Sequence, residues 1–538
     1  MRTSLIGGDV THRGLFGGRI SKTRVWTLSV ALVAGFTAAA FWQLWGLIAL
    51  AVLPLVAWFV TIDTENNTVL QRNIDKRSYR DRVQRGLTTF VPYDKDGWDA
   101  LTDAWSSARG RRARRAAERQ MHAMRLTPDG VEGMLWLRER NRMPGIQWHR
   151  PSFGQEYLAV VFSTTGQVEG IESDAVFDAS AAGYEQVLAQ FGAALTLPNR
   201  VQTISRILPS DPAPHEAWLA EHGDDSIPDE IHESYREVVD DISAAQLVNR
   251  PMFVVCWPVT DRFVARAERA GDGIDGWLAV MDREIRSVTA AFTAARFRNV
   301  RALTARQTAA VLRHLQHPGF PMDQAGDITP DRAWLPSQED WSYMTYVGAP
   351  EGQLSQSLSR TCRVTAKDVK ISHRTSLWMA PMLGEMEHQV VRTISFHLEL
   401  TPQDHALFLA EKDRVSDIAD ANRRARGGGI EDTTLTVEQE AAKRRIADLT
   451  PGTGYAGANW VGYITVTAGS RQELSDAVEE ITAAASNAGI SKLTWLDPHQ
   501  QTAAAYTWPV GRGIASSNAS IGTRVEKLAA GKEAKESL

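Results

Sequence analysis

The chain has 538 residues, of which 43% are hydrophobic and 23% are charged, and its formal net charge is −5. This composition is ordinary for folded domains, and so small a net charge gives no global field that would favour nucleic acid. The two cysteines, Cys256 and Cys362, exclude a disulfide scaffold and a cysteine-rich metal site and fit a reducing cytosol.

Residues 1–24 combine glycines with scattered polar residues, which predicts a flexible cytoplasmic lead-in. Residues 25–60 follow with no Asp, Glu, Lys, Arg or His. This apolar run exceeds the roughly 18 to 20 residues of one membrane span, so it predicts a transmembrane hairpin of two short helices, 25–41 and 44–60. Tryptophans stand at the four helix ends, where they are expected to lie at the membrane interface: Trp26, Trp42, Trp45 and Trp58.

Basic residues flank the apolar run on both sides, whereas the predicted turn between its two helices carries no charge. The positive-inside rule therefore predicts a multi-pass protein of the inner (plasma) membrane with both termini in the cytoplasm. A cleaved signal peptide is the alternative. It is disfavoured because the run is much longer than the apolar region of such a peptide and no small-residue cleavage site follows it.

Residues 61–145 are expected to form a basic juxtamembrane connector. Within it, the twelve residues 108–119 contain six arginines, which are candidates for contact with lipid or nucleic acid: Arg109, Arg111, Arg112, Arg114, Arg115 and Arg119. The plainer interpretation is the solvated face of a connecting helix. Because no aromatic residues alternate with the arginines to stack bases, membrane lipid is favoured over nucleic acid as the partner.

Alternating strand and helix patterns then predict a first cytoplasmic α/β domain over residues 146–318. Strands are expected at 157–163, 201–208, 251–259 and 298–303, and helices at 180–195, 229–248 and 274–295. Thr304 is a good N-cap for a helix over residues 305–316, which Pro318 and Gly319 would end.

A linker rich in Pro, Gly and Asp, residues 319–336, leads to a second cytoplasmic α/β domain over residues 337–514. Helical spacing at 402–449 predicts a helical-hairpin insertion in this domain, and the tail at 515–538 is expected to be flexible. A β–α–β unit is predicted after the insertion, with strands at 460–467 and 492–496. The predicted fold class is thus α+β: a two-helix transmembrane hairpin followed by two α/β domains of split β-α-β type.

Motifs for catalysis are missing from the sequence. There is no GxxxxGK[ST] phosphate loop, no GxSxG elbow and no HExxH helix. The spacing of Glu385, Glu387 and His388 would suit a metal, but a di-metal site needs a second such motif, so a polar surface is favoured. Cys256 lies within an apolar strand and is interpreted as core. We therefore expect no catalytic residue, no cofactor-binding residue, no cofactor and no metal site.

Four segments carry a family resemblance: GLFGG (residues 14–18), and residues 284–315, 459–490 and 506–514. Their layout is similar to an actinobacterial family of membrane proteins from conjugative and integrative elements. It resembles the two-helix inner-membrane subunit of type IV secretion systems fused to the motor-less N-terminal domain of a conjugative, TraC-like ATPase. The resemblance implies a non-enzymatic inner-membrane scaffold that anchors and docks a separate hexameric ATPase motor, as a homo-oligomer or larger assembly.

Two other functions stay open. One is a membrane-bound enzyme whose site is assembled from residues distant in sequence, with carboxylates and histidines of residues 368–399 as candidates. The other is a membrane-tethered DNA-handling protein that uses the arginines of residues 108–119.

Overall fold

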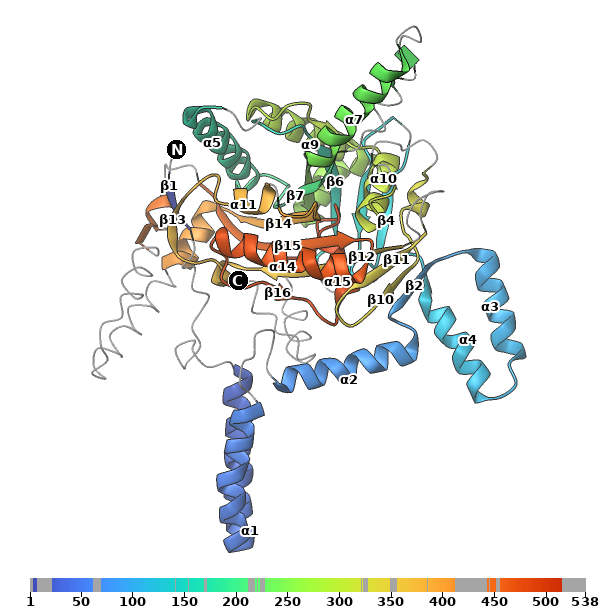
Figure 1. Cartoon of the computed structure of the whole chain (residues 1–538). Helices are drawn as coiled ribbons and strands as arrows, with labels where there is room; N and C mark the ends of the chain where they lie inside the picture. Colours follow the sequence, from blue (N-terminus) through green and yellow to red (C-terminus); the bar gives the residue numbers. More distant parts are fainter. Residues whose placement is uncertain are drawn as a thin grey trace.

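The structure of the chain is a computed structural model. It describes residues 3–6, 22–60, 69–140, 142–152, 154–168, 172–210, 218–219, 221–222, 228–320, 322, 328–348, 356–384, 386–411, 443–444, 446–450 and 455–514. A large, mostly antiparallel sheet forms its centre, and helices pack on both faces of this sheet (Figure 1).

The described strands fall into two sets that follow each other along the chain. The first set is β4 (Met134–Arg138), β5 (Ile146–His149), β6 (Tyr157–Ser163), β7 (Arg200–Pro209), β8 (Leu247–Pro258) and β9 (Arg301–Ala302). The second set is β10 (Ser337–Glu339), β11 (Met344–Val347), β12 (Gln356–Val364), β14 (Val391–Thr401), β15 (Gly457–Ala468) and β16 (Thr494–Trp495). The short strands β2 (Thr89–Pro92) and β3 (Met124–Arg125) extend the sheet beyond β10.

The two sets are arranged as an internal repeat. The spatial order is β4-β5-β6-β8-β7 in the first half and β10-β11-β12-β15-β14 in the second, and β7 pairs with β14 where the halves meet. In each half the two strands nearest the centre form a hairpin, β7–β8 in the first half and β14–β15 in the second, and helical segments follow it. The chain then returns to the strand beside this hairpin, so that β9 pairs with β6 and β16 pairs with β12. The two halves are therefore related by an approximate two-fold axis between β7 and β14.

Side chains alternate between the two faces along each strand, so each face has its own core. On one face, called the α9 face, α5 (Asp174–Phe191), α8 (Asp261–Ala270) and α9 (Gly273–Ala294) cover the first half. There α11 (Ala380–Leu383) and α14 (Arg471–Asn487) cover the second half. The opposite face, called the C-terminal face, is covered by α10 (Ala305–Gln316), α15 (Gln500–Ala505) and residues 506–514.

Other helices extend away from the sheet (Figure 1). Four of them precede β4 in the chain. They are α1 (Lys22–Val60), α2 (Val69–Arg85) and an antiparallel pair formed by α3 (Lys95–Ser107) and α4 (Arg111–Ala123). From the first half, α7 (Asp229–Ala245) projects beyond the end of β7. Two 3₁₀ turns complete the order, η1 (Pro330–Arg332) and η2 (Ala366–Asp368).

The prediction of a transmembrane hairpin is wrong. A membrane span needs sufficient length and sufficient hydropathy within one helix, and no helix in the described part of the chain combines the two. The apolar run lies in α1, whose two halves approach each other: a Cβ on Gly35 would lie 2.8 Å from the Cα of Leu50. In a straight helix these residues would be about 22 Å apart. With this finding, the predicted multi-pass location in the inner membrane is withdrawn.

The prediction of two separate α/β domains is also wrong, because the sheet is continuous. β7 and β14 pair antiparallel from Arg200↔Glu399 to Ile207↔Arg392, in the middle of the molecule. Strand patterns in a sequence do not tell which strands pair across a domain boundary, and both strands carry the mixed polar and apolar residues typical of an edge. The linker predicted at 319–336 connects the two halves of one sheet.

Several predicted elements are confirmed at the level of single helices and strands. The helix expected at 305–316 is α10, and Thr304 caps it through a capping box with Gln307. The strand at 298–303 is shorter than predicted, since β9 covers Arg301–Ala302 alone. Most of the predicted helical insertion, 412–442, lies outside the described residues, as does the tail. Of the predicted flexible lead-in, Thr3–Ile6 forms β1, which pairs with β13 (Ser372–Thr375).

Candidate functional site

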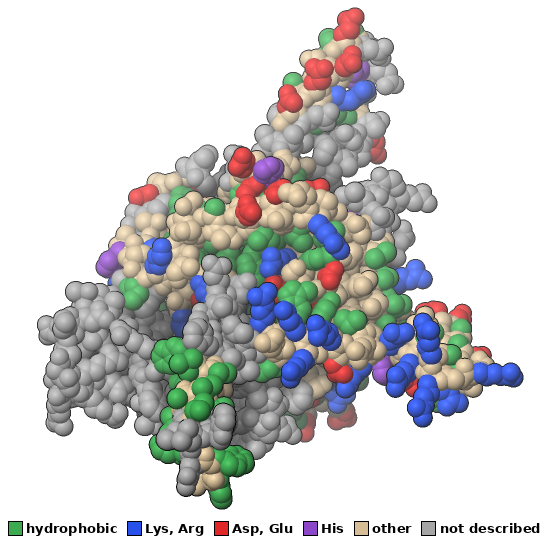
Figure 2. Space-filling model, turned by 60° about the horizontal axis from the view of Figure 1, so that its bottom comes forward, with side chains coloured by type: hydrophobic (Ala, Val, Ile, Leu, Met, Phe, Trp, Pro, Cys, Tyr) green, Lys and Arg blue, Asp and Glu red, His purple; other side chains and the backbone are tan. Residues whose placement is uncertain are grey.

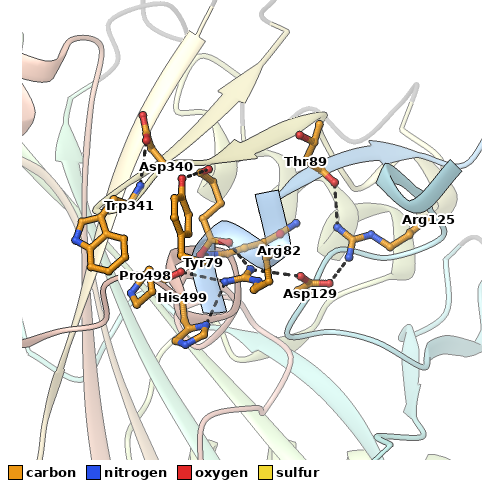
Figure 3. Close-up of polar contacts among 11 residues, drawn as sticks. Tyr79, Arg82, Thr89, Arg125, Asp129, Asp340, Trp341, Pro498 and His499 are labelled. Atoms are coloured by element: carbon orange, nitrogen blue, oxygen red, sulfur yellow. Dashed lines mark hydrogen bonds and ion pairs between the residues drawn. The ribbon is translucent and has the colours of Figure 1, made fainter. Parts of the chain in front are cut away.

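The C-terminal end of α2 is fixed to the sheet by a cluster of charged residues (Figure 3). Its centre is Arg82, whose guanidinium makes a short ion pair with Glu339 of β10 and lies 3.9 Å from Asp129. The same guanidinium donates to the carbonyl of Pro498 at 3.1 Å and to Nδ1 of His499 at 3.2 Å. One side chain thus joins α2, β10, the turn at Asp129 and the segment before α15. We call this group, together with Arg125, the Arg82 cluster.

Glu339 is the most buried acid of the cluster, with a side chain that is 0% exposed. Burial raises the pKa of its carboxyl to about 7, and the neighbouring Arg82 opposes this rise. The Oε1 atom of Glu339 accepts from the backbone N–H of Gln501 at 3.5 Å. Because a substrate in bulk solvent cannot reach a carboxylate with no exposed surface, this acid holds elements together in the structure.

The second acid, Asp129, is paired with Arg125. Arg125 makes a short ion pair with Asp129, donates to the carbonyl of Thr89 at 3.2 Å and lies over the ring of Phe90. Burial raises the pKa of Asp129, while Arg125 lowers it. The Asp129 carboxylate therefore links β2 and β3 to Arg82.

Aromatic contacts support the same docking of α2. The ring of Tyr79 meets Trp341 edge-on, with 5.4 Å between their centroids. Its hydroxyl donates to the backbone carbonyl of Glu339 at 3.3 Å. Ring packing and a partly buried hydrogen bond together fix one turn of α2 next to β10.

Docking of α2 also orients the basic helix α4. The helix α2 ends at Arg85 and is followed by Gly86, whose φ of +77° favours glycine. A Cβ on Gly86 would lie 2.4 Å from the carbonyl oxygen of Arg119. His122 of α4 donates from Nδ1 to the carbonyl of Arg85 at 3.0 Å. The Arg82 cluster thereby holds α2, and α2 in turn holds α4.

The six arginines predicted as a contact site lie together on α4 and on the turn before it. All six side chains are exposed, and they form the basic arm visible in Figure 2: Arg109, Arg111, Arg112, Arg114, Arg115 and Arg119. Trp105 of α3 lies next to them, 39% exposed, with the guanidinium of Arg114 over its ring at 5.8 Å. An exposed aromatic side chain therefore accompanies the arginines, although it comes from the neighbouring helix.

The predicted interfacial tryptophans are far from this arm in sequence and belong to α1. Trp42 is 70% exposed and Trp58 is 49% exposed. The side chains of Trp26 and Trp45 lie outside the described part of the structure. Without a membrane span, their predicted position at a membrane interface is withdrawn.

The remaining candidates have structural partners. His388 makes a short ion pair with Glu480 of α14, which raises the pKa of the imidazole, and Glu385 lies outside the described residues. No cluster of three metal-ligating side chains occurs among the residues that the structure describes. Cys256 is buried, and burial raises the pKa of its thiol to about 11, which disfavours the nucleophilic thiolate.

Sequence reasoning missed a second buried polar group, on the C-terminal face. Polar side chains from five strands bind the backbone of residues 506–514, and we call them the tail cradle: Gln147, Tyr157, Gln202, His397 and Tyr463. The Gln202 amide donates to the carbonyl of Trp508 at 2.8 Å and accepts from the N–H of Gly511 at 2.8 Å. The cradle holds the chain's own backbone, and the only signal in the sequence was the presence of Gln, His and Tyr at strand positions.

A comparison with protein families and with curated proteins finds no match for this chain. The description of the protein as a transmembrane component is contradicted by the structure, and nothing in the comparisons supports type IV secretion or conjugation. The predicted membrane anchorage and the predicted place in a type IV secretion or conjugation machine are therefore withdrawn.

Proposed function

We propose that this chain is a non-enzymatic docking protein that assembles with other protein chains through the helices projecting from its sheet. The observation that carries the proposal is the surface of α7. Ile231, Tyr235 and Val238 recur at helical spacing on one side of this helix and are 57%, 44% and 50% exposed. A helix of a folded domain normally buries such a stripe, so the stripe supports a protein interface.

Two further features support the same function. The sheet forms a broad base, and its central strands bury side chains on both faces. The Arg82 cluster and its contacts hold α2 and α4 in a defined orientation on this base. A defined orientation lowers the entropy that a docking surface loses on binding.

The test measures the size of the full-length chain in native cell extract. The chain itself has a mass of 59.4 kDa, so a docking protein is expected in a larger particle. The variant Ile231→Ser with Val238→Ser is expected to release the chain from that particle without changing its thermal stability, because both side chains are half-exposed.

The matched control is Ile274→Ser on α9, since Ile274 is 58% exposed but lies outside α7. This control is expected to stay in the particle. The proposal would be overturned if the wild-type chain migrated as a single copy in extract. It would also be overturned if the α7 substitutions left the size of the particle unchanged.

A further inference from the structure

We infer that the partner of α7 is the basic helix α4 of a second copy of this chain; this inference rests on the proposed docking function. It follows from the charges that accompany the apolar stripe. Glu230, Glu233 and Glu237 are exposed along one side of α7, next to Ile231 and Val238. A partner for this helix therefore has to offer both positive charge and an apolar contact.

The helix α4 offers both features at matching spacing. Arg112, Arg115 and Arg119 follow one another at intervals of three and four residues, as do Glu230, Glu233 and Glu237 on α7. All three arginines are exposed. Two helices laid side by side would place the two rows opposite each other over two turns.

The apolar stripe of α7 also has a complementary surface on α4. Beside the arginine row, α4 carries the small side chains of Ala113 and Ala116, over which Ile231 and Val238 can approach closely. Small residues on one helix and larger apolar residues on the other allow helix axes to lie about 8 to 10 Å apart. Apolar contact supplies affinity, and the charge rows fix the register.

The two helices cannot meet within one chain. In both views of the molecule α7 projects at one end, whereas α3 and α4 project at a different side (Figures 1 and 2). Pairing therefore takes place between copies, with α7 of one copy on α4 of another. A two-fold arrangement makes this contact twice and closes as a dimer, whereas any other arrangement runs head to tail. Head-to-tail contacts form a closed ring or an open filament according to the rotation between neighbours.

The experiment uses the purified full chain and sedimentation velocity at about 50 mM and about 500 mM salt, where screening lengths differ severalfold. Wild-type chain is expected to assemble at low salt and to dissociate at high salt. An acidic-to-basic variant of α7 (Glu230→Lys, Glu233→Lys, Glu237→Lys) and a basic-to-acidic variant of α4 (Arg112→Glu, Arg115→Glu, Arg119→Glu) should each associate at least about tenfold more weakly.

The decisive arm is an equal mixture of the two variants. The altered α7 of one variant then faces the altered α4 of the other with opposite charge, so assembly is expected to return. This rescue distinguishes loss of the contact from misfolding, because a misfolded variant would not regain assembly on mixing. The control Glu268→Lys with Glu479→Lys reverses two exposed helix acids elsewhere and should assemble as wild type does.

Three outcomes overturn the inference: a wild-type chain that stays monomeric at low salt, single variants that assemble normally, or a mixture that stays dissociated. Salt-sensitive binding of a DNA duplex that is lost in the α4 variant, without self-association, would assign α4 to nucleic acid instead. A purified monomer that still joins an α7-dependent particle in extract would refute self-pairing and leave the docking function standing.

Discussion

Neighbouring residues of β7 show how differently the two faces of the sheet are held. Val201 points to the α9 face and packs in an apolar cluster, in which Phe253 stacks on Phe292 with ring centroids 4.6 Å apart. Gln202 points to the C-terminal face and binds the backbone of Trp508 and Gly511. Apolar burial holds helices on the first face, and directed hydrogen bonds hold an extended segment on the second. Of four predictions, given in order of decreasing effect, the first and third test this difference, and the second and fourth extend the comparison to charged contacts.

The largest effect is expected on the α9 face. Phe292→Ala removes a fully buried ring between Phe162, Phe191 and Phe253, so the free energy of unfolding should fall by about 3 to 5 kcal/mol. Urea denaturation measures this loss, and Phe292→Leu should cost less than about 1.5 kcal/mol. A small loss for the alanine variant would mean that this face does not depend on close packing.

The second prediction concerns pH and the Arg82 cluster. Burial raises the pKa of Glu339 from 4.5 in the unfolded chain to about 7 in the folded one, so the protonated folded form is favoured. A carboxyl whose folded pKa is raised contributes stability below its unfolded pKa, and that stability is lost as pH rises through the folded pKa. We therefore expect the free energy of unfolding to fall by about 3 kcal/mol between pH 4.5 and pH 7.

Denaturation at a series of pH values measures this fall. Glu339→Gln keeps the size and hydrogen-bonding capacity of the side chain but does not titrate, so the decline should be much shallower. Glu118→Gln, at an exposed acid of α4, serves as the control and should follow the wild type. An unchanged pH profile in Glu339→Gln would show that other groups dominate.

The third prediction weakens the tail cradle. Gln202→Leu leaves the carbonyl of Trp508 and the N–H of Gly511 buried without this partner, which should cost about 1 to 3 kcal/mol. The effect should be local, so hydrogen exchange at the Gly511 amide should accelerate more than exchange in α9. Ser205→Ala on the same strand faces the other side and should stay within about 0.5 kcal/mol of wild type. Unchanged protection at Gly511 would contradict the role given to Gln202.

The smallest effect is expected at the surface. Glu480 raises the pKa of the exposed His388, so the protonated imidazole is favoured, and any stability from the pair is lost as pH rises through the raised pKa. In Glu480→Gln the pKa of His388, followed by NMR, should drop towards its ordinary value of about 6.5. Thermal stability should hardly change, because His388 is exposed and a glutamine at position 480 keeps an oxygen that can accept from the backbone N–H of His388. A large fall in melting temperature would show that the pair anchors α14.

What could be predicted from the sequence depends on how far apart in the chain the interacting residues lie. The helix α10 was predictable because Thr304 and Gln307 form a local capping box, and β8 because apolar residues run through it. These signals lie within a few residues of each other. They sufficed for α10 on the C-terminal face and for α9 on the opposite face, because both helices show apolar periodicity and α10 also has its local cap.

The cluster and the cradle depend instead on residues far apart in the chain. Arg82 and Glu339 are 257 residues apart, and a charged residue at either position has the appearance of a surface residue in sequence. Gln202 and His397 likewise appear as breaks in an apolar strand pattern, although both are buried. Of the candidate contact site, the arginine row was predictable because it is contiguous, whereas its pairing with Trp105 depends on how α3 folds back on α4.

The tail cradle also has a consequence for the order of events during synthesis. Apart from β2 and β3, which extend the second half, each half of the sheet is continuous in sequence, so each can begin to fold as it leaves the ribosome. Residues 506–514 emerge after both halves and bind to β5, β6, β7, β14 and β15. Until they do, polar side chains from strands of both halves lack these partners. A nascent or truncated chain without residues 506–514 would therefore be a substrate for chaperones, and proteolysis of stalled chains should cleave preferentially at this face.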